Sequence, residues 1–307
     1  MAERGSSSRR LEPLRFVDAG VLTIAYCEAG PVDGPAVVLL HGFPYDIHSY
    51  VDVAPQLAEK GCRVIVPYLR GYGPTRFRDA AAPRSGEQAA IGADLIALID
   101  ALAIPRAVFA GYDWGGRAAC IGAALWPERC TGLVSVNGYL IQDIANALQP
   151  ASVRQELAFW YQWYFQTERG RAGLAANRRE IANMLWRQWS PNWQFDAETF
   201  ERTAQAFDNP DYVDVAIHSY RHRYGLAAGD PRYDDIQRRL TALPPITVPA
   251  ITLDGDADGV VPATDGVAQA AKFLGPRRHR VVPRAGHNLP QEEPEAFAAA
   301  VLELIGG

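Results

Sequence analysis

Residues 111–116 (GYDWGG) place a carboxylate among glycines at a turn. The apolar run 107–110 precedes this motif and a helix-like stretch over 115–126 follows it, so Asp113 stands between a strand and a helix. Glycines leave room for a sharp, strained turn that holds a nucleophile exposed at its tip. Asp113 is therefore a candidate nucleophile. The alternative is that Asp113 only caps the helix.

His287 is the candidate general base. It lies in Arg284-Ala-Gly-His-Asn, just after the last strand-like run, at 280–282. The remaining histidines are weaker candidates: His41, His48, His218, His222 and His279. His218 and His222 have a spacing that suits metal ligands, but no third ligand stands nearby, so we expect no metal.

The acid that orients His287 should lie in the loop after the strand-like run 250–253. Three aspartates compete there: Asp254, Asp256 and Asp258. We choose Asp258, three residues past Gly255, and expect the other two to cap or bind backbone. The order nucleophile, acid, histidine then fits a hydrolytic triad. Asn137 is no alternative, because an amide carries no charge to stabilise an imidazolium.

Backbone N–H groups near Asp113 should complete the site. The motif His41-Gly-Phe-Pro44 follows the apolar run 36–40, and such a loop supplies one donor to an oxyanion hole. The residue after the nucleophile supplies the other. We assign the two N–H groups to Phe43 and Trp114; the alternative is a plain strand-to-loop turn.

Apolar runs and helix-like stretches alternate along both ends of the chain, which predicts a mostly parallel, doubly wound α/β sheet. Strands are expected at 36–40, 63–67, 107–110, 133–136, 250–253 and 280–282. Helices are expected at about 50–60, 88–102, 115–126, 152–168, 174–188 and 294–304.

The alternation breaks between residues 141 and 245, which are rich in Trp, Tyr, Arg and Gln and show no buried strand. We expect this segment to be an inserted helical cap. The expected core is then 13–140 and 246–307, after a disordered tail at 1–12. The alternative is two side-by-side domains, but the later strands are too few for a second sheet.

Composition narrows the function classes. The 307 residues carry 35 acidic and 30 basic side chains, a formal charge of −5, which argues against a nucleic-acid partner. The four cysteines form no CxxC pair and suggest buried free thiols. No apolar stretch is long enough to span a membrane, and the N-terminus has no signal-peptide core. We expect a cytoplasmic protein, monomeric or homodimeric.

The motifs HGFP, RGYGPT, GYDWGG, GDAD and AGHN occur in one order along nearly the whole chain. Together they resemble the epoxide hydrolase and haloalkane dehalogenase branch of the α/β-hydrolase fold. The resemblance implies that Asp113 attacks an alkyl carbon and that water then hydrolyses the ester, without a cofactor or metal. An aspartate suits this chemistry, because a serine would give an ether that water does not cleave.

Two cap tyrosines favour an epoxide over a halide. An epoxide oxygen leaves as an alkoxide and needs a hydrogen-bond donor, whereas a halide needs only N–H groups. Residues 161–166 (YQWYFQ) resemble the epoxide hydrolase segment whose first tyrosine opens the ring, which implies that role for Tyr161. His218-Ser-Tyr-Arg221 resembles the segment with the second tyrosine, Tyr220, although the family more often has Trp before it. The alternative is that both tyrosines only pack the cap.

Two positions depart from the epoxide hydrolase pattern. Tyr112 stands where these enzymes commonly have His before the nucleophile. Arg117 is similar to one of the two arginines that hold a substrate carboxylate in haloacetate dehalogenases, but Trp114 stands where the other would be. We expect Arg117 to be structural. The sequence thus predicts an epoxide hydrolase that uses a small epoxide and water; a dehalogenase is the alternative, and a silent binding protein the more distant one.

Overall fold

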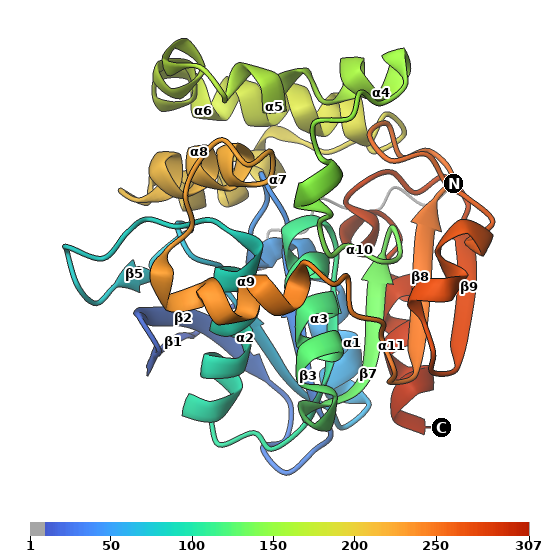
Figure 1. The fold of residues 1–307 in the computed structure, drawn as a ribbon. Helices are drawn as coiled ribbons and strands as arrows, with labels where there is room; N and C mark the ends of the chain where they lie inside the picture. Colours follow the sequence, from blue (N-terminus) through green and yellow to red (C-terminus); the bar gives the residue numbers. More distant parts are fainter. Residues whose placement is uncertain (1–9, 307) are drawn as a thin grey trace.

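A mostly parallel β-sheet forms the centre of the protein in the computed structural model, which describes residues 10–306 (Figure 1). The order across the sheet is β1-β2-β4-β3-β6-β7-β8-β9, with β5 beside β2. The strands are β1 (Leu14–Ala19), β2 (Leu22–Ala29), β3 (Ala36–Leu40), β4 (Arg63–Pro67), β5 (Arg76–Phe77), β6 (Ala107–Gly111), β7 (Cys130–Val136), β8 (Ala250–Gly255) and β9 (Arg277–Val282).

The parallel strands are the ones that the apolar runs predicted. β3, β4 and β6 to β9 pair in parallel, and every residue of β6 and β8 is buried, as expected for strands covered on both faces. The antiparallel edge strands β1, β2 and β5 were not predicted. The burial of β1 is broken by exposed positions, so this strand offers no continuous apolar run.

Helices cover both faces of the sheet. α2 and α3 contact each other on one face, and α1 and α11 contact each other on the opposite face (Figure 1). The helices are α1 (Val53–Glu59), α2 (Gln88–Ala101), α3 (Asp113–Leu125), α4 (Val153–Ala158), α5 (Trp160–Tyr164), α6 (Glu168–Trp189), α7 (Ala197–Ala204), α8 (Tyr212–His222), α9 (Asp234–Leu240), α10 (Leu289–Glu292) and α11 (Pro294–Gly306). Short 3-10 helices lie at Ile47–Tyr50, Pro127–Arg129, Ile144–Asn146, Gln205–Asp208, Pro231–Tyr233 and Val267–Lys272.

The strands on either side of the long helical segment belong to one sheet. β8 pairs with β7 in parallel, with Leu133 opposite Ala250, so the residues between them are an excursion from a single sheet. Helices α4 to α8 lie together beyond the ends of the strands, whereas α9 returns along the core and contacts α2 (Figure 1).

Local details of the helical segment differ from the expectation. The helix expected at 152–168 is two short helices, α4 and α5, which meet at Phe159. The helix expected at 174–188 is longer, and it is kinked at Asn177, whose φ of −126° is not helical.

The expected tail at 1–12 lies mainly outside the described residues. Leu11, which the sequence placed in that tail, is buried and packs into the core. Among residues 10–306, no helix is long and apolar enough to cross a membrane.

Candidate active site

Asp113 lies at the sharp turn between β6 and α3. It is the first residue of α3 and has a φ of 49°, a left-handed conformation that is uncommon for a residue other than glycine. A Cβ on Gly115 would overlap the Leu40 carbonyl oxygen, and one on Gly42 would come within 2.6 Å of the Asp113 Cβ. The glycines therefore let three backbone segments meet around one carboxylate.

The Asp113 carboxylate is held from two sides. Its Oδ1 accepts a hydrogen bond of 2.8 Å from the Phe43 N–H, and its Oδ2 lies 3.7 Å from His287 Nε2. Burial alone would raise the pKa of Asp113, but His287, Arg117 and the Phe43 N–H outweigh it, and the net pKa is lowered. Asp113 is thus ionised near neutral pH, as a nucleophile must be.

The second ring nitrogen of His287 faces Asp258. The Nδ1 to Oδ2 distance is 2.9 Å, and both side chains are almost fully buried. Burial would lower the pKa of His287, but Asp258 and Asp113 together raise it to about 10. His287 is therefore an imidazolium between two carboxylates while Asp113 is free.

Of the three competing aspartates, Asp258 is the one brought against His287. Its Oδ1 accepts from the N–H groups of Val260 and Val261 at 2.8 and 2.9 Å. Asp254 instead accepts from Thr264, and Asp256 from the Arg284 N–H. Those two carboxylates bind nearby backbone, as the sequence had suggested.

The expected oxyanion donors flank Asp113. The Phe43 N–H already points at the carboxylate, and Trp114 follows Asp113 in the first turn of α3, where N–H groups have no intrahelical acceptor. The rings of Phe43 and Trp114 stack with centroids 5.6 Å apart. The Phe43 N–H thus already binds Asp113, and the Trp114 N–H stays a predicted second donor.

Tyr161 on α5 and Tyr220 on α8 lie above Phe43, with their own ring centroids 5.2 Å apart. The Tyr161 hydroxyl accepts a 3.0 Å hydrogen bond from Gln162 Nε2, which leaves its own proton free to donate. The Tyr220 hydroxyl is buried without a hydrogen-bond partner among the described residues. Burial raises the pKa of both tyrosines, so both stay protonated.

Sequence reasoning missed several polar residues that contact the predicted ones. Asn137 Nδ2 donates to Asp258 Oδ2 at 3.3 Å. Gln162 is held by Tyr224, whose hydroxyl donates to its Oε1 at 2.8 Å. The position of Asn137 directly after β7 was a usable signal, because strand ends meet at one edge of a parallel sheet. For Gln162, the only sequence signal was its position next to Tyr161.

Two other positions that the sequence singled out make hydrogen bonds to neighbouring segments. Tyr112 occupies the place before the nucleophile and makes a 2.7 Å hydrogen bond between its hydroxyl and Ser49 Oγ. His218 accepts from the Gly86 N–H through Nδ1. Across residues 10–306, no group of three or more His, Cys, Asp or Glu side chains is arranged to hold a metal. All four cysteines are buried and unpaired.

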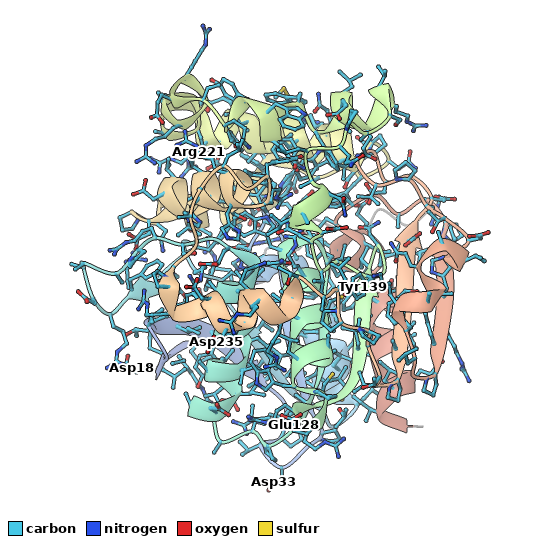
Figure 2. The ribbon with its side chains drawn as sticks, in the orientation of Figure 1. Asp18, Asp33, Glu128, Tyr139, Arg221 and Asp235 are labelled. Atoms are coloured by element: carbon cyan, nitrogen blue, oxygen red, sulfur yellow. The ribbon has the colours of Figure 1, made fainter. Side chains whose placement is uncertain are left out.

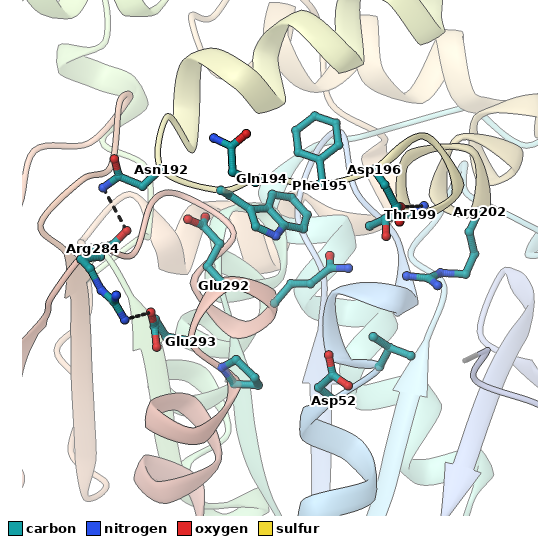
Figure 3. Close-up of a pocket in the computed structure, with 14 residues that line it drawn as sticks. Asp52, Asn192, Gln194, Phe195, Asp196, Thr199, Arg202, Arg284, Glu292 and Glu293 are labelled. Atoms are coloured by element: carbon teal, nitrogen blue, oxygen red, sulfur yellow. Dashed lines mark hydrogen bonds and ion pairs between the residues drawn. The ribbon is translucent and has the colours of Figure 1, made fainter. Parts of the chain in front are cut away.

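A surface pocket of about 410 Å³ lies near the site but does not contain the nucleophile. Figure 3 shows Phe195, Glu292 and Arg202 around it, and Trp193 also lines it. Glu292 lies at its wall and accepts from Ser190 Oγ at 2.6 Å and from the Gly286 and Asn288 N–H groups, on either side of His287. Burial raises the pKa of Glu292 to about 7. Glu292, at the wall of this pocket, therefore holds the loop that carries His287.

The match to a known family agrees with this geometry. The sequence model described as "alpha/beta hydrolase fold" matches residues 35–294. The chain belongs to the α/β hydrolase fold family. The expected fold is thus confirmed.

Two of the relatives that follow share most of their length with this chain, and the third shares about a third of its length. Epoxide hydrolase A of Mycobacterium tuberculosis (strain ATCC 25618 / H37Rv) is 29% identical over 319 residues, which cover 95% of this chain and 97% of that protein. A crystal structure of a candidate epoxide hydrolase from Klebsiella pneumoniae subsp. pneumoniae MGH 78578 is 51% identical, with a TM-score of 0.94 and coverage of 96% and 97%. Bifunctional epoxide hydrolase 2 of Mus musculus is 34% identical over 68% of this chain and 34% of that protein.

Proposed function

We propose that this α/β hydrolase is an epoxide hydrolase, which converts an epoxide and water to a vicinal diol through an ester on Asp113. The observation that carries the proposal is the ionised Asp113 carboxylate between the Phe43 N–H and His287, with two protonated tyrosines above it. The names of the relatives support the same reaction.

In the first step, an Asp113 oxygen forms a bond to a ring carbon while the carbon–oxygen bond of the epoxide breaks. The alkoxide takes a proton from Tyr161 or Tyr220, whose hydroxyls offer the hydrogen bonds that stabilise the developing charge. The product of this step is a hydroxyalkyl ester of Asp113 and a tyrosinate.

Formation of the ester changes the acidity of His287. The charge of Asp113 and its interaction with Nε2 both help to hold the pKa of His287 at about 10. The ester has lost that charge, so this pKa falls. The imidazolium can then return its proton to the tyrosinate through solvent. Formation of the ester bond therefore removes the charge of Asp113 and makes His287 available as the base of the second step.

In the second step, neutral His287 takes a proton from water, and the water oxygen adds to the ester carbonyl carbon. The N–H groups of Phe43 and Trp114 hold the oxyanion. The tetrahedral centre collapses, the departing oxygen of the diol takes the proton from His287, and Asp113 is left as an acid. Its proton passes to His287, which restores the carboxylate and the imidazolium held by Asp258.

The proposal extends to the organisation of the protein. We assign residues 13–140 and 246–307 to the catalytic core and 141–245 to the cap, since both tyrosines lie on helices of that segment. The reaction as drawn uses the side chains, substrate and water alone, without a cofactor or metal. A cytoplasmic location is supported by four buried, unpaired cysteines. A monomer or homodimer with no nucleic-acid partner fits the acidic balance.

The test presents purified protein with an aryl epoxide, a haloalkane and a haloacetate in parallel, and assays diol and free halide. Asp113→Asn is the control, because the amide is not a nucleophile. We expect diol from the wild type and a loss of at least about ten-thousandfold in the variant. Halide release without diol would instead identify a dehalogenase, and diol formation that survives in Asp113→Asn would rule out the ester mechanism.

A further inference from the structure

Two arginines near the nucleophile have no role in the proposed reaction. Arg117 lies on α3, in the turn that follows Asp113, and is only 8% exposed. Its Nε donates a hydrogen bond of 3.2 Å to the Leu140 carbonyl oxygen. Neither Arg117 nor Arg223, at the C-terminal end of α8, makes an ion pair within residues 10–306. Arg117 is buried and Arg223 is half-buried, and guanidinium groups that are withdrawn from water without a carboxylate partner are unusual.

Arg223 approaches the same place from the helical segment. Its guanidinium carbon lies 4.3 Å from the centroid of the Tyr220 ring. Nη1 donates to Gln162 Oε1 at 3.3 Å, but Nε and Nη2 are buried without any partner among the described residues. Buried donors on a charged group cost free energy unless an acceptor joins them.

The two cations act on each other and on the site. Burial and the positive charge of Arg223 lower the pKa of Arg117 to about 10, while Asp113, Tyr220 and Tyr161 oppose that effect. Arg117 therefore stays charged at neutral pH. Its charge and that of Arg223 both act on the two tyrosines that face Asp113.

Several polar groups around the Tyr220 ring can donate a hydrogen bond and have no partner among the described residues. Besides the two nitrogens of Arg223, they include the Tyr220 hydroxyl and Trp114 Nε1, and the Trp114 and Tyr220 rings are 5.9 Å apart, whereas Asn288 Oδ1, next to His287, is an unpartnered acceptor. The donors beside Tyr220 therefore lack acceptors. The epoxide oxygen can satisfy the tyrosines, but it carries no charge to match the two guanidinium groups.

The charge balance points to a single anion. Asp113, Asp258 and protonated His287 together leave one negative charge, and the two arginines turn this into one positive charge. A substrate with one negative charge would neutralise it, and a carboxylate matches the planar fork of a guanidinium. A phosphate monoester brings nearly two charges and fits the balance less well.

We propose that the substrate is an epoxide that bears a carboxylate close to the ring, and that Arg117 and Arg223 bind this carboxylate. This inference rests on the proposed epoxide hydrolysis and names its substrate class. The two arginines come from opposite sides of the site, one from the core and one from the helical segment, so the carboxylate would also fix the orientation of the ring above Asp113.

Binding of an unreactive analogue tests the subsite without catalysis. The probes are trans-2-phenylcyclopropane-1-carboxylate and its primary amide, which differ in charge and not in shape, and calorimetry gives both affinities. We expect the carboxylate to bind at least about tenfold more tightly, and the preference to fall below about threefold in Arg223→Met and in Arg117→Met. If Arg117→Met does not fold, Arg223→Met decides alone.

Arg171→Met is the matched control. Arg171 pairs with Asp214 and so links α6 to α8 at the surface, where both side chains are exposed. Arg221, which precedes Arg223 on α8, pairs with Glu168 and is labelled in Figure 2 near the outside of the helical segment. The carboxylate preference should persist in Arg171→Met. Equal affinity for the two probes in the wild type, or a preference that survives both Arg223→Met and Arg117→Met, would overturn the inference.

Turnover separates this inference from the proposed function. The substrates are trans-3-phenylglycidate and trans-β-methylstyrene oxide, in which a methyl group replaces the carboxylate. We expect kcat/KM to favour the glycidate by at least about tenfold in the wild type and this ratio to collapse in Arg223→Met. Equal turnover of both would overturn the carboxylate subsite and leave epoxide hydrolysis standing. If neither is hydrolysed while the arginine-dependent binding preference persists, the proposed function fails and the anion site stands.

Discussion

The core side and the helical side of this active site differ in how completely their polar groups are paired. On the core side, Asp113 is held by Phe43 and faces His287, and His287 is held by Asp258. On the helical side, the Tyr220 hydroxyl and two nitrogens of Arg223 are buried without partners. The core side is therefore assembled before substrate arrives, whereas the helical side still needs acceptors from the substrate. The difference suggests that the core sets the reaction and the helical segment selects what reacts.

Replacement of His287 by Gln should break the core side with the largest effect on turnover. Asp113 can still attack, but the ester has no base to activate water, so kcat should fall by about a thousandfold or more. Mass spectrometry of the protein after exposure to epoxide should show one substrate mass added to the peptide that contains Asp113. A variant that loses activity without any trapped ester would contradict the role of His287 in the second step.

Replacement of Tyr161 or Tyr220 by Phe should affect the helical side of the site and the first step, ester formation. Each loss removes one donor to the alkoxide, so each should lower the rate of ester formation by about tenfold to a hundredfold, and the double variant by more. Rapid-quench kinetics should find no ester accumulating, in contrast with His287→Gln. Unchanged single-turnover rates in the double variant would show that neither tyrosine takes part in ring opening and that both only pack the helical segment.

The pH dependence of stability concerns folding and not turnover, and it should be confined to the core side. Burial raises the pKa of Glu292 to about 7, from an ordinary value near 4.5. Folding thus favours the neutral form of Glu292. The contribution of Glu292 to the free energy of unfolding is therefore fully present below about pH 4.5 and is lost as pH rises through 7. The free energy of unfolding should fall by about 3 kcal/mol across that window.

Denaturant unfolding from pH 4.5 to 10 checks this expectation. Glu292→Gln should flatten the acidic part of the profile and lower stability, because an amide cannot accept the three hydrogen bonds that the carboxyl accepts. His287→Gln is the matched comparison. The pKa of His287 is about 10, so its contribution is lost between about pH 6.5 and 10, and that variant should flatten the alkaline part instead. Identical profiles for the two variants would contradict these assignments.

The sequence alone determined the features that rest on neighbouring residues. The turn at Asp113 follows from Gly111 to Gly116, because only small residues allow the close approach of three backbone segments. The apolar runs predicted all six parallel strands, and β6 and β8, in which every residue is buried, gave the clearest signal. The antiparallel strand β1 escaped prediction because a half-exposed strand lacks that signal.

Tertiary structure decided what depends on residues far apart in the chain. The loop after β8 offers three aspartates of similar chemistry, and the packing of that loop against the loop after β9 brings Asp258 to His287. Arg223 lies 106 positions from Arg117, and no local pattern signals that a helix end beyond the sheet places its guanidinium beside Tyr220. Local backbone geometry determines the position of the nucleophile. The residues around it come from distant segments, whose path in space is not encoded in short-range sequence spacing.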